Sequence, residues 1–88
     1  MEVIKQIAGI LKKMGTEEEI SNFLSEILTE SELCALSNRW RILKMLVDGK
    51  TQREVTKELN VSLCNVTRGA KILRKKDSVS RKYLIKEI

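Results

Sequence analysis

The chain lacks proline and histidine altogether, and only two of its 88 residues are cysteine. Because histidine is absent and Cys34 lies 30 positions from Cys64, no group of residues has the spacing of a metal site, and we expect no metal and no cofactor. No nucleophile has an evident general base, so an enzyme is not expected. We expect both cysteines to be small buried or half-buried side chains.

Long apolar runs are missing as well. Lys5, Lys12 and Lys13 interrupt the first apolar segment, which predicts neither a signal peptide nor a membrane span. We therefore expect a cytoplasmic protein. A single domain of residues 1–88 would bury only about 60% of the surface that its unfolded chain exposes, and so small a core favours association with a second chain.

Acidic residues are scarce in the second half of the chain. Residues 1–49 carry six basic and eight acidic side chains, a net charge of −2, whereas residues 50–88 carry eleven and four, a net charge of +7. A basic half beside a nearly neutral half favours a surface that binds a polyanion. The alternative is a charged surface that serves only solubility.

The chain also has no alternating strand pattern, and its apolar residues recur at steps of three and four. This pattern predicts an all-α fold of about six short helices. The first three helices are expected over 3–13, 17–28 and 30–48, followed by a helix-turn-helix within 51–74 and a C-terminal helix over 78–88.

Helix ends are predicted from two kinds of signal. Gly15, Gly49 and Asn60 tolerate the left-handed backbone that ends a helix. Helix starts are expected where a threonine precedes a glutamate by three residues, because the two can exchange capping hydrogen bonds. These pairs are Thr16 with Glu19, Thr29 with Glu32, and Thr51 with Glu54.

The helix over 30–48 has apolar residues on two neighbouring faces. One stripe consists of Leu33, Leu36, Trp40, Leu43 and Val47, and the other of Ala35, Ile42 and Leu46. A helix with this pattern is covered on much of its circumference. We expect a second protomer to supply part of the cover, with residues 1–49 as the dimerisation core. Bundle packing in a protein that is not a regulator would explain the stripes equally well.

From Gln52 the sequence reads QREVTKELNVSLCNVTRG, in which each position fits two short helices crossing at a steep angle. Asn60 is expected to form the turn, with Val61 between the helices and Ser62 as the cap of the second helix. The residues predicted to face inward are Val55, Leu59, Leu63, Val66, Ala70 and Leu73. Thr56 stands where a smaller alanine is more usual. A helix-turn-helix used only for protein contacts is the alternative.

The outward face of the second helix carries donors and cations of the kind that contact DNA. They are Asn65, Thr67, Arg68, Lys71, Arg74 and Lys75, with Gln52 and Arg53 on the preceding helix. Donors near the start of such a helix reach base edges, and cations on its flanks reach phosphates. Because phosphate contacts dominate affinity, binding should weaken steeply as salt rises.

A second stripe on the same helix consists of Asn65, Arg68, Gly69 and Ile72. A glycine inside a helix costs about 1 kcal/mol relative to alanine, so Gly69 suggests close approach of something flat. Arg39 interrupts an apolar stripe of the helix over 30–48, and an arginine can stack on a ring while pairing with a carboxylate. The alternative is that Gly69 packs against backbone and that Arg39 and Arg68 form salt bridges.

Four short motifs carry a resemblance to a known family: LT at 28–29, AL..R.RI at 35–42, QRE at 52–54 and VTRG at 66–69. Together they cover about residues 28–73 and resemble the bacterial tryptophan repressor family. The resemblance implies an intertwined, all-helical homodimer that binds double-stranded operator DNA. It also implies a small corepressor, L-tryptophan, which holds the reading heads at the spacing of successive major grooves.

The resemblance assigns roles to individual residues. Arg39 and Arg68 correspond to the pair that sandwiches the indole, Thr29 and Gly69 to pocket lining, and the Leu28 carbonyl to an acceptor for the ligand ammonium. The residues predicted to bind DNA are Arg41, Gln52, Arg53, Thr56, Leu63, Cys64, Asn65, Thr67, Lys71 and Arg74.

Ile72 departs from the family pattern, because the family usually has a serine there that helps to hold the ammonium. An indole ligand without the ammonium would suit Ile72 better. The connector DGKTQRE is also one residue shorter than usual. The leading interpretation is a ligand-gated repressor; the alternatives are a helix-turn-helix regulator with a different or no effector, and a helical protein-interaction module.

Overall fold

The computed structural model describes residues 1–86, and every regular element in that range is an α-helix. The helices are α1 (Glu2–Lys13), α2 (Glu17–Ile27), α3 (Glu30–Val47), α4 (Gln52–Leu59), α5 (Leu63–Arg74) and α6 (Val79–Lys86). The all-α prediction is confirmed, with helix ends within one residue of those expected for the first three helices. Residues 87 and 88 of the predicted C-terminal helix lie outside the described range. No helix in the described part is long and apolar enough to cross a membrane.

The chain divides into two compact units, Met1–Leu33 and Cys34–Ile88. The first unit contains α1 and α2, both strongly amphipathic, and neither helix buries a single residue. Their apolar faces are therefore only partly covered in the isolated chain, with Val3, Ile4 and Ile27 among the exposed side chains.

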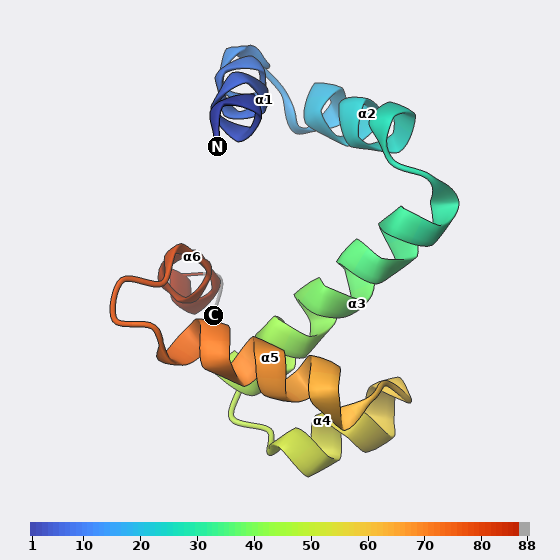
Figure 1. The fold of residues 1–88 in the computed structure, drawn as a ribbon, viewed down its shortest axis with the longest axis vertical. Helices are drawn as coiled ribbons and strands as arrows, with labels where there is room; N and C mark the ends of the chain where they lie inside the picture. The colour runs from blue at the N-terminus through green and yellow to red at the C-terminus, as the bar shows by residue number, and fades with distance from the viewer. Residues whose placement is uncertain (87–88) are drawn as a thin grey trace. The chain divides into compact units, whose positions relative to one another are not determined.

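The core of the second unit lies where α3, α4 and α5 meet, with α4 and α5 near the C-terminal end of α3 (Figure 1). Ile42, Val55 and Val66, one from each helix, are almost completely buried. The half-buried side chains packed around them are Met45, Leu46, Leu59 and Val61. The predicted inward positions Val55, Leu59 and Val66 are thus found in the core, and Val61 packs there between the two helices.

The turn between α4 and α5 follows the predicted chemistry. Asn60 adopts the left-handed conformation at the end of α4, with φ 52° and ψ 48°. The Ser62 hydroxyl accepts a hydrogen bond from the Asn65 N–H and caps α5. Gly49 likewise has a positive φ, of 98°, after α3. These local groups set where each helix stops and starts.

Two of the three predicted capping boxes are complete. Thr29 with Glu32 and Thr51 with Glu54 each exchange both hydrogen bonds. In the third, the Thr16 hydroxyl accepts from the Glu19 N–H, but the Glu19 carboxylate accepts from the N–H of Gly15. The prediction that Gly15 ends α1 in a left-handed conformation was wrong, because α1 ends at an extended Met14.

Two other predictions about burial were wrong. Leu63 is 58% exposed, because it opens α5 before the helix reaches the core around Val66. Cys34 and Cys64 are both exposed and unpaired thiols. Cys64 lies in the first turn of α5, about 200° around the helix from Val66, and Cys34 lies two turns before Ile42.

Candidate functional site

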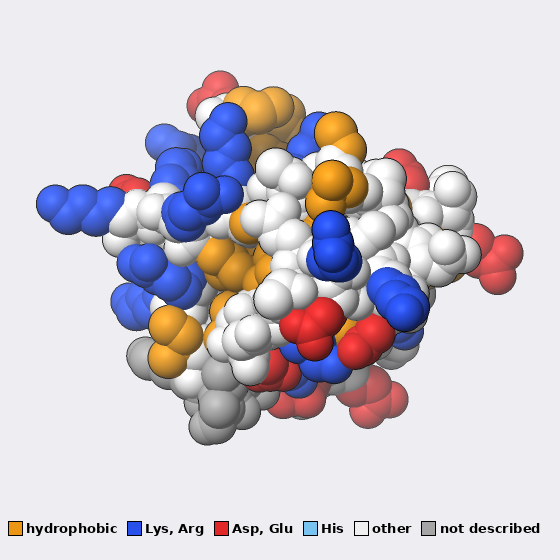
Figure 2. Space-filling model, turned by 90° about the horizontal axis from the view of Figure 1, so that it is seen from below, with side chains coloured by type: hydrophobic (Ala, Val, Ile, Leu, Met, Phe, Trp, Pro, Cys, Tyr) orange, Lys and Arg blue, Asp and Glu red, His pale blue; other side chains and the backbone are white. Residues whose placement is uncertain are grey.

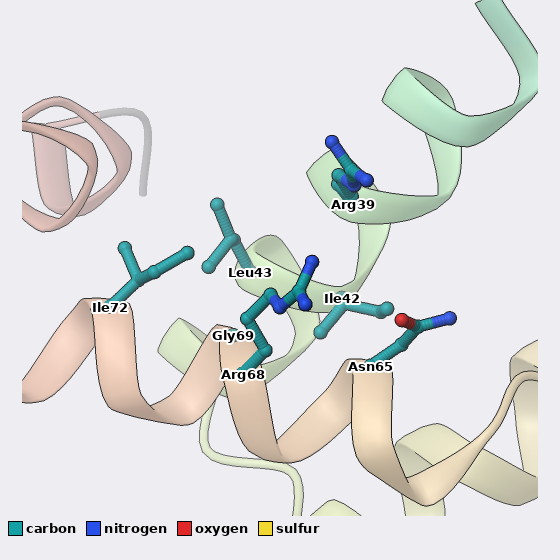
Figure 3. A pocket seen from close by; sticks show the side chains of 7 residues that line it. All are labelled: Arg39, Ile42, Leu43, Asn65, Arg68, Gly69 and Ile72. Atoms are coloured by element: carbon teal, nitrogen blue, oxygen red, sulfur yellow. The ribbon is translucent and has the colours of Figure 1, made fainter. Parts of the chain in front are cut away.

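A partly enclosed slot lies between α3 and α5. It is lined by Arg39, Ile42 and Leu43 from α3 and by Asn65, Arg68, Gly69 and Ile72 from α5 (Figure 3). The structure therefore brings together four of the residues predicted to bind a ligand, Arg39, Arg68, Gly69 and Ile72. Ile42 and Leu43 were missed as slot residues, because in the sequence they are ordinary apolar positions of a core helix.

Gly69 forms the part of the slot where α5 comes closest to α3. It is buried, and a Cβ atom added to it would lie 2.8 Å from the Cγ2 atom of Ile42. The same added atom would lie 3.6 Å from Leu43 and Leu46. The glycine is thus explained by the side chain of Ile42. The alternative that Gly69 packs against backbone was therefore wrong, because its nearest neighbour is a side chain.

The two arginines of the slot carry its charge. Within residues 1–86, neither Arg39 nor Arg68 makes a hydrogen bond or an ion pair, so the predicted alternative of two salt bridges was wrong. Figure 3 shows Arg68 rising from α5 beside Ile42, with Arg39 above it on α3. Among the described residues, no acidic side chain lines the slot. An apolar wall with two free guanidiniums favours a flat ligand that carries a negative charge.

Asn65 and Ile72 lie at opposite ends of the α5 side of the slot (Figure 3). Their separation of seven residues corresponds to about 10 Å along a helix axis. One end of the slot therefore offers the amide of Asn65, and the other the sec-butyl side chain of Ile72, which has no hydrogen-bonding atom.

Leu28 and Thr29 belong to the first unit of the chain. The Thr29 hydroxyl already accepts the hydrogen bond of the Glu32 N–H as the cap of α3. That Leu28 and Thr29 contact a ligand stays a prediction.

The surface of α4 and α5 contains most of the residues predicted to bind DNA. The exposed ones are Arg53, Leu63, Cys64, Asn65, Thr67, Lys71 and Arg74, whereas Gln52 and Thr56 are half-buried. Arg41, which is also exposed, lies on α3. A shallow hollow between the two helices is lined by Gln52, Arg53, Thr56, Lys57 and Leu63. Lys57 was missed, although its spacing of four from Arg53 places both cations on one face of α4.

Two hydrogen bonds organise this surface. The Thr67 hydroxyl donates to the side-chain oxygen of Gln52 at 3.1 Å and links α5 to the start of α4. The Thr56 hydroxyl donates to the Gln52 carbonyl oxygen at 2.8 Å. The unusual threonine therefore satisfies its polar group within its own helix, and Gln52 keeps its amide donors for another partner.

Acidic groups near α4 are already engaged. Lys50 and Glu58 form an ion pair of 2.6 Å, and the hydrogen bond to Glu58 raises the pKa of Lys50 above its usual value. The Thr51 hydrogen bonds lower the pKa of Glu54. Glu58 is therefore held by Lys50, which precedes α4, and Glu54 by Thr51, the cap of α4.

A profile of the family described as Trp repressor protein matches residues 2–87. The chain belongs to the Trp repressor family. Its relatives include a Trp operon repressor homolog of Xylella fastidiosa (strain M23), 34% identical over 88 residues, which are 99% of this chain and 94% of that protein. A Trp operon repressor homolog of Chlamydia trachomatis serovar D is 32% identical over 80 residues, which are 90% of this chain and 85% of that protein.

A third relative, the Trp operon repressor homolog of Haemophilus influenzae (strain PittEE), is 33% identical over 69 residues, or 77% of this chain and 68% of that protein. No solved structure matches the chain significantly. The Trp repressor family consists of transcription regulators and not of enzymes, so the chain is a member of a repressor family. The resemblance predicted from the four short motifs is confirmed over nearly the whole chain.

Proposed function

We propose that this protein is a homodimeric transcription repressor that binds double-stranded operator DNA with α4 and α5 and is gated by a small corepressor in the slot between α3 and α5. One observation carries the proposal: a single helix serves both surfaces. Arg68 and Gly69 of α5 line the slot, while Thr67 and Lys71 of the same helix are exposed. A ligand that fills the slot would therefore act directly on the orientation of the reading helix.

The gating follows from where the slot lies. Because its two walls belong to α3 and α5, a bound ligand adds contacts that hold α5 at one angle to α3. If α5 is already fixed before DNA binds, less conformational entropy is lost when the helix docks in the major groove. Exposed Arg53 and Arg74 would then contact phosphates, and Asn65 and the first turn of α5 would reach base edges.

L-tryptophan is the proposed corepressor. Its indole would lie between the guanidiniums of Arg39 and Arg68, and its carboxylate would pair with Arg68. Both guanidiniums are free in the described residues. The family resemblance assigns Thr29 to the pocket lining and the Leu28 carbonyl to the ammonium end of the ligand.

A second candidate ligand is favoured by the chemistry of the lining. The described residues that line the slot between α3 and α5 include two cations and no carboxylate or hydroxyl side chain, and Ile72 offers no acceptor to an ammonium group. A deaminated indole acid such as indole-3-propionate would keep the pairing with Arg68 and avoid an unmatched ammonium beside two positive charges.

Calorimetric titration of the protein with L-tryptophan and with indole-3-propionate separates the two ligands. Tighter binding of indole-3-propionate favours the deaminated acid, and equal or tighter binding of tryptophan rejects it. Ile72→Ser adds an acceptor and should shift the preference toward tryptophan. Ile72→Val, which keeps the position apolar, is the matched control and should leave the preference unchanged.

Dimerisation is supported by apolar surface that the chain leaves open. No residue of α1 or α2 is buried, and on α3 the side chains of Leu36 and Trp40 are 45% and 48% exposed. A small domain rarely leaves that much apolar surface in water, and a second copy would cover it. The proposed repressor acts in the cytoplasm, where its operator lies.

Two other functions make different predictions. A regulator with a different effector or none would bind DNA equally well with and without tryptophan. A helical protein-interaction module would not bind DNA even at low salt. The test is to enrich duplexes from a random pool with the purified protein and to measure the affinity of the enriched duplex by fluorescence anisotropy at low salt. Specific binding by a dimer supports the proposal, and no enrichment contradicts it.

A further inference from the structure

The segment that joins α5 to α6 carries a dense positive charge, of which the predicted DNA surface uses only the first part. Residues 74–82 read RKKDSVSRK and contain five cations and one acid. Of this segment, Arg74 was predicted to bind DNA and Lys75 was counted among the cations available to it, whereas Lys76, Arg81 and Lys82 were not. In Figure 2, lysines and arginines gather at the left of the view, the side on which α5 runs into α6 in Figure 1.

Arg81 holds this loop in one shape. Its guanidinium donates to the Leu73 carbonyl oxygen at 3.3 Å and to the Lys76 carbonyl oxygen at 3.1 Å. Its N–H donates to the hydroxyl of Ser78, which caps α6. The half-buried arginine thus satisfies carbonyls that the end of α5 leaves free. The guanidinium of Arg81 is therefore occupied by hydrogen bonds to backbone carbonyl oxygens, and these bonds order the loop without a ligand.

Two cations on the loop remain free. Lys75 and Lys76 are exposed, and within residues 1–86 neither side chain makes an ion pair or a hydrogen bond. Asp77 is the one acid of the loop and forms no ion pair with either in the described part. A short, preordered loop therefore presents two adjacent ammonium groups to the solvent.

The position of these ammonium groups points to a DNA backbone. Lys75 is the C-cap of α5 and follows Lys71 of its last turn by four residues, so the loop continues the basic surface of the proposed reading helix. The first turn of that helix holds the groups suited to base edges, whereas the polar side chains of its last turn, Lys71 and Arg74, are both cations, which suits the phosphates where a helix leaves the groove. Lysine binds phosphate as a point charge and carries no sequence preference.

We propose that Lys75 and Lys76, held by Arg81, form a phosphate clamp that extends the DNA footprint beyond α4 and α5. The proposal rests on the proposed DNA-binding function. The clamp contributes affinity and salt dependence, and it leaves the choice of sequence to the first turn of α5.

The test compares the wild type with Lys75→Gln/Lys76→Gln on the enriched duplex and on an unrelated duplex, over a series of salt concentrations. Each lost phosphate contact reduces the slope of log affinity against log salt by about 0.9, so the double variant should lose about 1.8 per reading head. The ratio of the two affinities should stay the same. Lys12→Gln/Lys13→Gln removes the same charge from α1 and should leave the slope unchanged.

Asp77→Asn should have the opposite effect on DNA affinity, because it removes the loop's one acid. It should tighten binding to both duplexes by about the same factor. An unchanged slope for Lys75→Gln/Lys76→Gln overturns the clamp, as does a slope that falls equally in the α1 control. If these lysines instead control binding to vesicles containing phosphatidylglycerol and not to DNA, the clamp is overturned in favour of a membrane surface. If the wild type binds no DNA at low salt, the proposed function itself fails.

Discussion

A methyl group added to Gly69 would lie 2.8 Å from the Cγ2 atom of Ile42, closer than two carbon atoms approach without displacement. Ile42 is 2% exposed and branched at its Cβ, so that methyl group cannot move aside without disturbing the core. Gly69→Ala should gain about 1 kcal/mol of helix propensity and lose about 1–3 kcal/mol to overpacking. We expect a net loss of about 1 kcal/mol in the free energy of unfolding, measured by urea denaturation.

Gly9→Ala is the control for Gly69→Ala, because Gly9 lies inside α1 with no atom near its missing Cβ. This variant should stabilise the protein by up to about 1 kcal/mol. In an Ile42→Ala background the cost of Gly69→Ala should shrink or reverse. Equal stabilisation by Gly9→Ala and Gly69→Ala would show that Ile42 does not require the glycine.

At the same scale, the sequence predicted which side of a helix turns inward better than it predicted how far each residue is buried. The period of apolar positions placed Val55 and Val66 correctly, because it records which side of a helix turns inward. Leu63 and Cys64 were misplaced, because their exposure depends on whether another helix reaches the first turn of α5. The sequence flagged Gly69 as unusual, but only the structure shows that Ile42, nearly thirty residues away, requires it.

At the scale of helices, the carboxylates of Glu32 and Glu54 link stability to pH. Hydrogen bonds from the Thr29 and Thr51 caps lower the pKa of each carboxyl below its usual 4.5. Because the folded pKa is the lower one, this stabilisation is complete above about pH 4.5 and is lost as the pH falls through the folded pKa. The unfolding midpoint should therefore drop on acidification below that value.

Glu32→Gln/Glu54→Gln keeps an acceptor at both caps and removes the titrating group. Thermal unfolding between pH 3 and pH 6, followed by circular dichroism, should show a smaller loss of stability in this variant than in the wild type. Glu18→Gln, at an exposed carboxylate that makes no hydrogen bond or ion pair in the described part, should behave like the wild type. Identical acid sensitivity in all three proteins would show that the carboxylates of these caps do not cause the loss of stability at low pH.

Helix ends were the most predictable part of the fold, and the reason is local chemistry. The Thr51–Glu54 box, the Asn60 turn and the Ser62 cap each involve groups within four residues of one another. Arg81 was missed because it joins a carbonyl eight residues away, at Leu73, and no pattern of neighbouring residues marks such a bond. The slot was only half predicted for the same reason, since Ile42 and Leu43 reach it through the packing of α3 on α5.

At the scale of the whole molecule, the exposed apolar face of α3 predicts a dimer. Leu36→Glu would place a charge in the proposed interface, where burial without a partner is costly. Sedimentation equilibrium at micromolar concentration should show a shift from dimer toward monomer. Ser37→Glu adds the same charge one position away on the same helix and is the control. A wild type that sediments as a monomer would contradict the proposed dimer.

The central claim is that one helix, α5, joins the ligand slot to the DNA surface, and Arg68 is the residue that tests it. The measurement is the affinity for an enriched duplex, with and without saturating L-tryptophan, in the wild type and in Arg68→Ala. We predict that the ligand tightens DNA binding of the wild type by about tenfold or more, within the usual range of coupling between sites, and that Arg68→Ala abolishes this gain while remaining helical. Equal affinity of the wild type with and without ligand would contradict the account.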